Sequence, residues 1–167
     1  MNDRHEVNSL AVAAVALSDN ARLLIARHAQ RTYPEECVGL LLGHRRENQL
    51  VIRAAVPLNN IAPEESRRHA YRMAPGELLA VQYIADDYGV ELIGCYHSHP
   101  DMPAVPSRAD RQGAASIVGS FLFLIQRVGA DAAAELRAWQ LCDDHFTEIE
   151  FGASDAGTND GGTDAQR

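Results

Sequence analysis

Two histidines and a later aspartate have the residue types and spacing to bind one divalent cation. His97 and His99 are separated by a single residue in the segment 90–99, which we predict to be a strand. Residues i and i+2 of a strand point to the same face, so the two imidazoles are expected to lie side by side. Asp110 follows as a possible third ligand from the next predicted helix. Two histidines and one carboxylate, with one position left open for water, are typical of a catalytic rather than a structural zinc site.

A hydrolytic zinc site also needs a general base, and Glu36 is the best candidate for that role. Glu36 lies at the start of an apolar segment, 37–45, that we predict to be a buried central strand. A carboxylate is costly to bury there without a partner, and a water molecule on a metal would be a good partner. The adjacent Glu35 is the competing candidate.

The order and spacing of these residues resemble those of a known family. Glu36 begins an E-x-x-G motif ahead of an apolar run, and residues 97–100 read H-S-H-P. After six intervening residues, Ser107 and Asp110 form S-x-x-D. The whole pattern resembles that of the JAMM (Mov34/MPN/PAD-type) metallopeptidases, and the resemblance extends over most of 10–150. It is strongest at the two motifs.

The resemblance implies a role for each of five side chains. The ligands of a zinc ion (Zn²⁺) would be His97, His99 and Asp110. Glu36 would be the general base, and Ser107 would help to stabilise the oxyanion of the tetrahedral state.

Two further features concern the same resemblance. The cysteine that the family often has directly before the glycine is displaced here to Cys37, with Val38 preceding the glycine, and this change does not affect the chemistry. The region around Asn59, followed by a short predicted strand at 69–73 and by Pro75, also resembles the small bacterial members.

Several of these residues have a simpler interpretation. Ser107 and Asp110 also fit a helix capping box, which would orient the helix that carries Asp110. Cys95 shares a strand face with the two histidines, so it is either a further ligand or a small buried residue behind the site. Arg67 and Arg68 belong to a solvated loop or hold a substrate carboxylate. The remaining histidines have no partner at ligand spacing and are expected to be surface or structural residues: His5, His28, His44, His69 and His145.

The compact chain favours one class of substrate within the family that it resembles. It has no obvious insertion of the kind that forms a ubiquitin-binding surface in the eukaryotic enzymes. It looks more like the stand-alone bacterial members, which act on small ubiquitin-like sulfur-carrier proteins and release an amino acid such as cysteine attached after a C-terminal Gly-Gly. The alternative is a non-catalytic MPN scaffold that binds partners. The H-x-E and P-C-x-x-C motifs of nucleobase deaminases are absent, as is the HExxH motif of thermolysin-type enzymes.

The elements that must position these side chains alternate between strands and helices. Helices are predicted from Ser18 or Asp19 to about residue 32, from Pro75 to about Tyr88, and from Ser107 to about Ser116. Strands are predicted at 10–17, 37–45, 49–58, 69–73, 90–99, 121–128, 135–143 and 145–151, with Trp139 in the core and a turn at Asp143–Asp144. The pattern indicates an α+β fold, a single MPN/JAMM-like domain. In it, a curved mixed sheet is flanked by two main helices and a short helix that carries a metal ligand.

Composition sets the outer limits of the interpretation. The chain has 167 residues and a formal net charge of −8, which argues against nucleic acid or a membrane surface as the main partner. We predict one domain over 1–151 and a disordered Gly/Asp-rich tail over 152–167. The three cysteines are widely spaced, and no signal peptide or membrane-spanning segment is evident, so we expect reduced thiols in a soluble, cytoplasmic protein.

Overall fold

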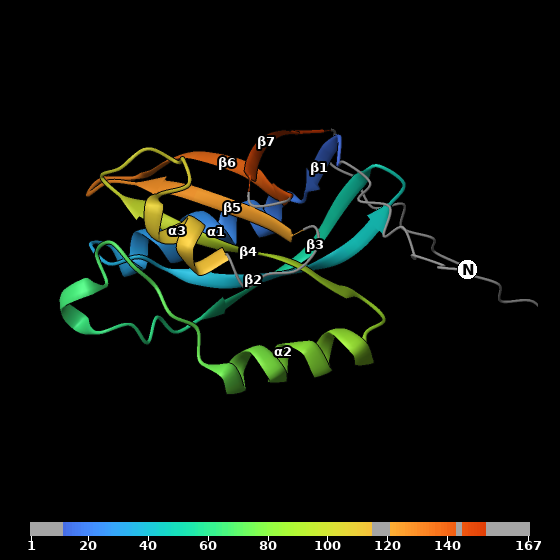
Figure 1. The fold of residues 1–167 in the computed structure, drawn as a ribbon, viewed down its shortest axis with the longest axis horizontal. Helices are drawn as coiled ribbons and strands as arrows, with labels where there is room; N and C mark the ends of the chain where they lie inside the picture. Colours follow the sequence, from blue (N-terminus) through green and yellow to red (C-terminus); the bar gives the residue numbers. More distant parts are fainter. Residues whose placement is uncertain (1–11, 115–120, 143–144, 153–167) are drawn as a thin grey trace, which may run out of the picture.

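A single mixed sheet organises the molecule. The computed structural model describes residues 12–114, 121–142 and 145–152. In this part of the chain the strands follow the order β1-β3-β2-β4-β5-β6-β7, and the sheet closes because β1 pairs with both β3 and β7 (Figure 1). The strands are β1 (Ala14–Leu17), β2 (Val38–Arg46), β3 (Gln49–Leu58), β4 (Glu91–Pro100), β5 (Phe121–Val128), β6 (Ala133–Cys142) and β7 (His145–Phe151).

Strand direction makes the sheet mixed, as the sequence predicts. β4 and β5 run parallel, and β1 is parallel to both of its neighbours. The other pairs are antiparallel: β2 with β3, β2 with β4, β5 with β6, and β6 with β7. The predicted α+β class and curved mixed sheet are therefore confirmed.

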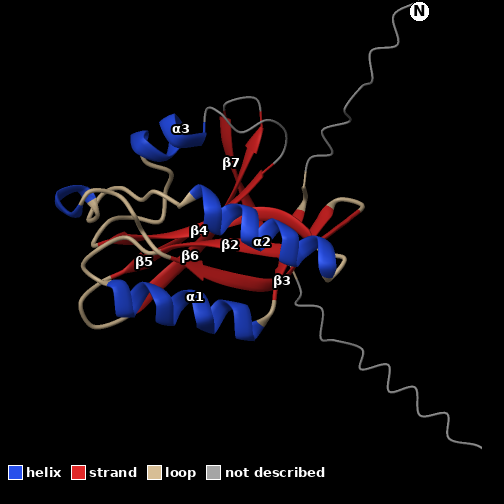
Figure 2. Cartoon of the chain, turned by 90° about the horizontal axis from the view of Figure 1, so that it is seen from below, coloured by secondary structure: helices blue, strands red, loops and turns tan. Residues whose placement is uncertain are grey.

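In the described residues three α-helices cover the two faces of the sheet: α1 (Asp19–Thr32), α2 (Pro75–Asp87) and α3 (Arg108–Ala114). A short 3₁₀ helix (Glu64–Ser66) lies in the loop after β3. Figures 1 and 2 show α1 and α3 on opposite sides of the sheet. Buried residues of α1 belong to one apolar cluster with one sheet face, whereas α2 and α3 contribute to a second cluster with the other face. In the described residues no helix combines the length and apolar character that crossing a membrane requires.

The ends of the first two helices follow the sequence signals. The side chain of Ser18 accepts a hydrogen bond from the backbone N–H of Ala21 at 3.2 Å, which caps α1 as predicted. Pro75 occupies the first turn of α2, and Gly89 beyond its end has a φ of +63°. Both helices therefore form where the sequence places them.

The strand predicted at 69–73 is wrong, because in the structure His69 ends a turn and 70–73 form a loop outside the sheet. A side chain takes the place of a neighbouring strand: the Asn60 amide donates to Ala70 O at 3.1 Å, and Asn60 Oδ1 accepts from the N–H of Arg72 at 3.1 Å. One backbone hydrogen bond, from the N–H of Ile61 to Arg72 O, completes the contact. The side chains of this segment alternate as in a strand, but its backbone bonds to Asn60 and Ile61 and not to a neighbouring strand.

Some predicted boundaries, at the two ends of the chain and within it, fall outside the described residues. Gly152 is described, and its N–H donates to Val15 O at 3.0 Å beside the last pair of β1 and β7. The rest of the predicted tail lies outside the described part of the chain. The same is true of residues 10–11 of the first predicted strand, of the predicted end of the third helix at Ser116, and of the turn at 143–144.

The glycine of the E-x-x-G motif is required by a close approach of neighbouring groups. Gly39 lies opposite Tyr96 on β4, and a Cβ at Gly39 would overlap the Tyr96 ring and lie 2.5 Å from Val56 O. Tyr96 is fully buried, and its hydroxyl is hydrogen-bonded to His28 Nδ1 at 2.8 Å, so the ring has little room to move. Only glycine fits between these two neighbours without a shift.

Gly39→Ala is expected to lower the free energy of unfolding by about 2 kcal/mol or more, because overpacked cores cost about 1–3 kcal/mol and backbone is involved here. Chemical denaturation of the metal-free protein measures the change. The control is Gly76→Ala in α2, where a Cβ meets nothing within 4 Å and the stability should stay equal or rise slightly. An equal effect of both substitutions would contradict the packing argument.

Candidate metal centre and active site

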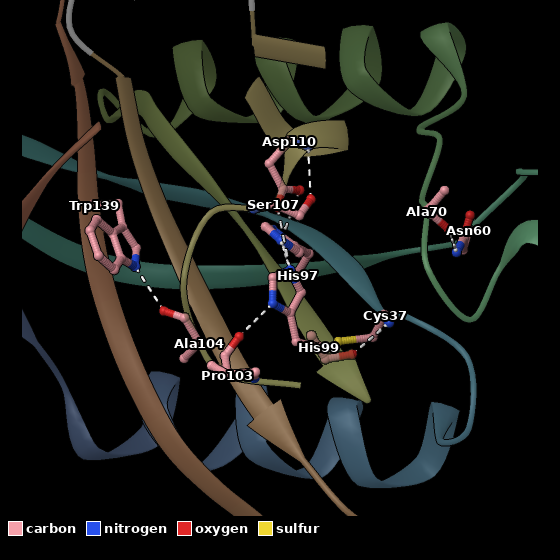
Figure 3. Close-up of polar contacts among 11 residues, drawn as sticks. Cys37, Asn60, Ala70, His97, His99, Pro103, Ala104, Ser107, Asp110 and Trp139 are labelled. Atoms are coloured by element: carbon pink, nitrogen blue, oxygen red, sulfur yellow. Dashed lines mark hydrogen bonds and ion pairs between the residues drawn. The ribbon is translucent and has the colours of Figure 1, made fainter. Parts of the chain in front are cut away.

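Two imidazoles and one carboxylate converge at the end of β4 that faces α3. His97 Nε2 lies 3.1 Å from His99 Nε2, and the two nitrogens lie 3.1 and 3.4 Å from the carboxylate oxygens of Asp110 (Figure 3). One possible ligand atom from each residue lies within 4.8 Å of the others, and all three residues are buried. The structure thus brings together the three residues that the sequence proposes as ligands.

The loop after β4 fixes the tautomer of His99. His99 Nδ1 lies 2.7 Å from Pro103 O, and because a carbonyl can only accept, Nδ1 carries the proton in this contact. In the neutral ring the lone pair is then on Nε2, which faces His97 and Asp110. Trp139 on β6 holds the same loop, since its Nε1–H donates to Ala104 O at 3.0 Å. A core tryptophan therefore supports the orientation of a site histidine.

The capping box predicted for α3 is present. The side chain of Ser107 accepts from the N–H of Asp110 at 3.1 Å, and the Asp110 carboxylate accepts from the N–H of Ser107 at 2.6 Å. The capping contacts orient Asp110 while its carboxylate also meets the histidines. A hydroxyl that accepts one bond keeps its own proton for donation, so the capping and oxyanion roles of Ser107 are compatible.

The charges of the three groups are strongly coupled. Burial works to raise the pKa of Asp110, but hydrogen bonds from His97 and His99, together with the charge of His97, outweigh it and hold this pKa well below its usual value. Burial lowers the pKa of His97. For His99, burial works in the same direction, but hydrogen bonds to Asp110 and to Pro103 O win and raise its pKa. The carboxylate therefore stays ionised and can act as an anionic ligand.

Glu36 lies beside this group, just before β2. The register pairs Val38 with His97, and Cys37 exchanges two hydrogen bonds with Ser98: its N–H donates to Ser98 Oγ at 2.9 Å, and its carbonyl accepts from the Ser98 N–H at 3.1 Å. Glu36 is buried, and together with His99 and Ser107 it lines a cavity of about 330 Å³. The competing candidate Glu35 is not among the residues lining this cavity.

The backbone of Glu36 is held by the loop that follows β3. Its N–H donates to Arg67 O at 2.7 Å, and its carbonyl accepts from Asn60 Nδ2 at 3.0 Å. Asn60 also bonds Ala70 O and the N–H groups of Ala62 and Arg72, so its amide ties Glu36 to the whole loop. Burial raises the pKa of Glu36 to about 8; the charge of His99 opposes this rise and that of Asp110 adds to it.

The donor set fits a divalent cation. Two imidazole nitrogens and a carboxylate oxygen meet at distances that a shared cation would relieve, and the fixed tautomer of His99 presents a lone pair to the centre. His97 Nδ1, on the far side of its ring, is buried and has no hydrogen-bond partner. Imidazole and carboxylate together suit Zn²⁺.

Comparison with known proteins agrees with this geometry. Residues 18–142 match the family of prokaryotic homologs of the JAB domain. The chain belongs to this family. A structure of a Desulfitobacterium hafniense protein is similar to this JAB domain with a TM-score of 0.72 and 25% identity, over 84% of this chain and 92% of that one.

Three curated proteins are similar to the JAB domain in sequence. A desampylase of Haloferax volcanii is 34% identical over 60% of this chain and 72% of that protein. A probable TtuB-protein conjugate cleaving protease of Thermus thermophilus is 42% identical over 50% of this chain and 51% of that protein. A CysO-cysteine peptidase of Mycobacterium tuberculosis is 28% identical over 80% of this chain and 86% of that protein.

Other residues around the JAB-domain site differ in how far the sequence predicts them. Cys95 is buried and does not belong to the metal-capable group found in the described residues, which supports its simpler interpretation. The Tyr71 ring packs 4.7 Å from that of His97, and His69, expected at the surface or in a structural role, lines the cavity with Glu36. Asn60 and the Pro103 carbonyl could not be found from the sequence, because an amide in a loop and a backbone carbonyl leave no spacing pattern.

The pKa of Glu36 gives a stability test for the metal-free protein. The unfolded chain releases this proton near pH 4.5, whereas the folded protein keeps it to about pH 8. Between these values the folded state binds the extra proton, so the stability of the wild type falls as the pH rises. Relative to Glu36→Gln, the wild type should lose on the order of 1–3 kcal/mol between about pH 5 and about pH 8.

Denaturant unfolding in the presence of a chelator measures this difference at both pH values. Glu35→Gln removes the neighbouring half-buried carboxylate but keeps Glu36, so it is the matched control and should lose stability with rising pH as the wild type does. A constant difference between wild type and Glu36→Gln over this pH range would contradict the raised pKa.

Proposed function

We propose that the protein is a zinc-dependent peptidase or isopeptidase that hydrolyses an amide bond. One observation carries the proposal: a buried carboxylate, Glu36, lines the same cavity as His99 and Ser107, beside the group formed by His97, His99 and Asp110. Burying so many polar groups costs free energy, and a metal-assisted reaction gives each of them a use. A non-catalytic scaffold, the alternative from the sequence, would need none of them in this cavity.

The metal would be held by three side chains. His97 and His99 supply the Nε2 atoms that face each other, and Asp110 supplies a carboxylate oxygen. When bound, zinc supplies Lewis-acid polarisation that lowers the pKa of a water molecule to about 7 and stabilises negative charge on a carbonyl oxygen.

Glu36 moves the proton in the proposed reaction. Its carboxylate accepts a proton from the attacking water and then delivers it to the leaving amine. Burial makes Glu36 a stronger base than an exposed glutamate. Two backbone hydrogen bonds keep Glu36 in place: its carbonyl accepts from Asn60, and its N–H donates to Arg67 O. The hydroxyl of Ser107 donates to the oxygen that becomes negative as the carbonyl is attacked.

The names of the relatives support a class of substrate. They refer to a desampylase, to cleavage of TtuB-protein conjugates and to the CysO-cysteine adduct. We propose that this chain acts at the C-terminal Gly-Gly of a small ubiquitin-like sulfur-carrier protein and releases an attached amino acid such as cysteine. Between β2 and β4 the described chain forms β3, a short 3₁₀ helix and α2, and no inserted domain that could bind a larger partner.

Glu36→Gln is expected to keep its zinc but to hydrolyse a Gly-Gly-cysteine adduct about 10²–10⁴ times more slowly, since only the proton carrier is removed. Metal analysis gives the zinc content, and mass spectrometry of the released carrier gives the rate. Glu35→Gln is the matched control and should stay active. Full activity of Glu36→Gln would refute the assignment of the base.

Ser107→Ala is expected to lower kcat by roughly 10²–10³, the usual cost of losing one oxyanion donor. Ser107→Thr keeps a hydroxyl and should retain more activity. Because Ser107 also caps α3, zinc affinity is measured on both variants by competition with a chelator. If Ser107→Ala loses activity only in proportion to its loss of zinc, the hydroxyl positions Asp110 and has no oxyanion role.

A further inference from the structure

We propose that Arg68 forms a subsite for the free α-carboxylate of the amino acid released by hydrolysis. The chain would then prefer a carrier bearing a single amino acid over one joined to a lysine side chain of another protein. This inference rests on the proposed function and specifies the leaving group of its substrate.

The first support is the composition of the cavity that holds Glu36. Besides Glu36, His99 and Ser107, its lining is mainly apolar, with Pro100, Met102 and Val105. Among the described residues that line it, Arg68 alone carries a guanidinium. Guanidinium groups bind carboxylates through two parallel hydrogen bonds, and such contacts are stronger beside apolar surface than in open water.

The second support is the position of Arg68 relative to the proton carrier. The N–H of Glu36 donates to Arg67 O at 2.7 Å, so Arg68 directly follows the residue that is bonded to the Glu36 backbone. In the proposed reaction Glu36 returns its proton to the leaving amine. The leaving residue must therefore lie at the Glu36 end of the cavity, where Arg68 also reaches the lining.

The two neighbouring arginines are engaged differently. Arg67 is committed to its own loop: Nε donates to Ala62 O at 2.8 Å, and a terminal nitrogen lies 3.8 Å from Glu35. The Arg68 side chain is 56% exposed, and within the described part of the chain its ion pair is a long one, 3.9 Å, to Asp101. Asp101 in turn accepts from the Tyr33 hydroxyl at 3.1 Å. One long contact to Asp101 leaves donors of the planar guanidinium for a second carboxylate.

Electrostatics explains why a cation matters at this position. In an α-amino acid the amine and the carboxylate are separated by one carbon, so the carboxylate must come close to Glu36 and Asp110. The chain also has a net charge of −8. Without Arg68, the negative charges of the site and of the chain as a whole would repel the α-carboxylate of the substrate. In a lysine isopeptide the leaving amine ends a long side chain, and the lysine carboxyl group is part of a neutral peptide bond.

The test uses the zinc-loaded full chain and three matched probes. Each probe is a ubiquitin-like carrier ending in Gly-Gly. The first bears cysteine with a free carboxylate, the second bears cysteine carboxamide, and the third is joined to a lysine side chain of a folded protein. The readout is kcat/KM for each probe, so the second and third probes report on folding and on the basal activity of every variant.

The wild type should prefer the free acid over the carboxamide by about 10-fold, as expected for a charge-assisted hydrogen bond at a partly exposed position. Arg68→Gln should remove this preference by slowing only the free-acid probe, and Arg68→Lys should keep part of it. Arg72→Gln, an equal loss of charge at an exposed position of the same loop, should leave the preference intact. His69→Gln should do the same, although His69 lines the cavity.

Three results would overturn the inference. The first is equal cleavage of acid and carboxamide by the wild type, which leaves the proposed function standing because both probes are cut. The second is an equal loss of preference in Arg72→Gln, which would point to loop charge in general. The third is a loss of preference in His69→Gln alone, which would assign the carboxylate to His69. No cleavage of any probe by the zinc-loaded chain would instead refute the proposed function itself.

Discussion

The pairing of β2 with β4 is the constraint on which the site depends. It sets Val38 opposite His97, and the two hydrogen bonds between Cys37 and Ser98 extend the pairing beyond the end of β2. Because side chains alternate along a strand, Ser98 can serve this contact while His97 and His99 face the other side. Glu36 precedes the paired residues and reaches the cavity beside the histidines. A general base and a ligand pair from distant parts of the chain thus meet through ordinary sheet hydrogen bonds.

The loops that follow β3 and β4 hold the site residues that the sheet brings together. The segment after β4 supplies a carbonyl to His99 and is held by Trp139 from the core. The segment after β3 holds Glu36 through Asn60 and Arg67. The site residues Glu36 and His99 are therefore held by backbone and amide groups that do not themselves take part in the proposed reaction. Such supporting contacts are common where a site must keep charged groups close together.

The sequence predicts much of the fold because its signals are local. Ser18, Pro75 and Gly89 mark helix ends by their own conformational preferences, and the i, i+2 spacing of His97 and His99 follows from strand geometry. The prediction of a strand at 69–73 fails because a strand needs a partner, and alternation alone cannot supply one. Asn60 could not be found for a related reason: its importance comes from four contacts that exist only in the folded chain.

The tight contact between Gly39 and Tyr96 has a consequence for how the sheet assembles. A slip of β2 by one residue along β4 would place Val38 or Leu40 opposite the Tyr96 ring, and a side chain there has no room. The same slip would turn Glu36 to the opposite face of the sheet. The close contact at Gly39 therefore favours the strand alignment that places Glu36 beside the histidines. It disfavours the alignments shifted by one residue, because a side chain would then clash with the Tyr96 ring. Packing in the core is therefore enough to select the correct strand alignment, without any contribution from the residues that carry out the proposed reaction.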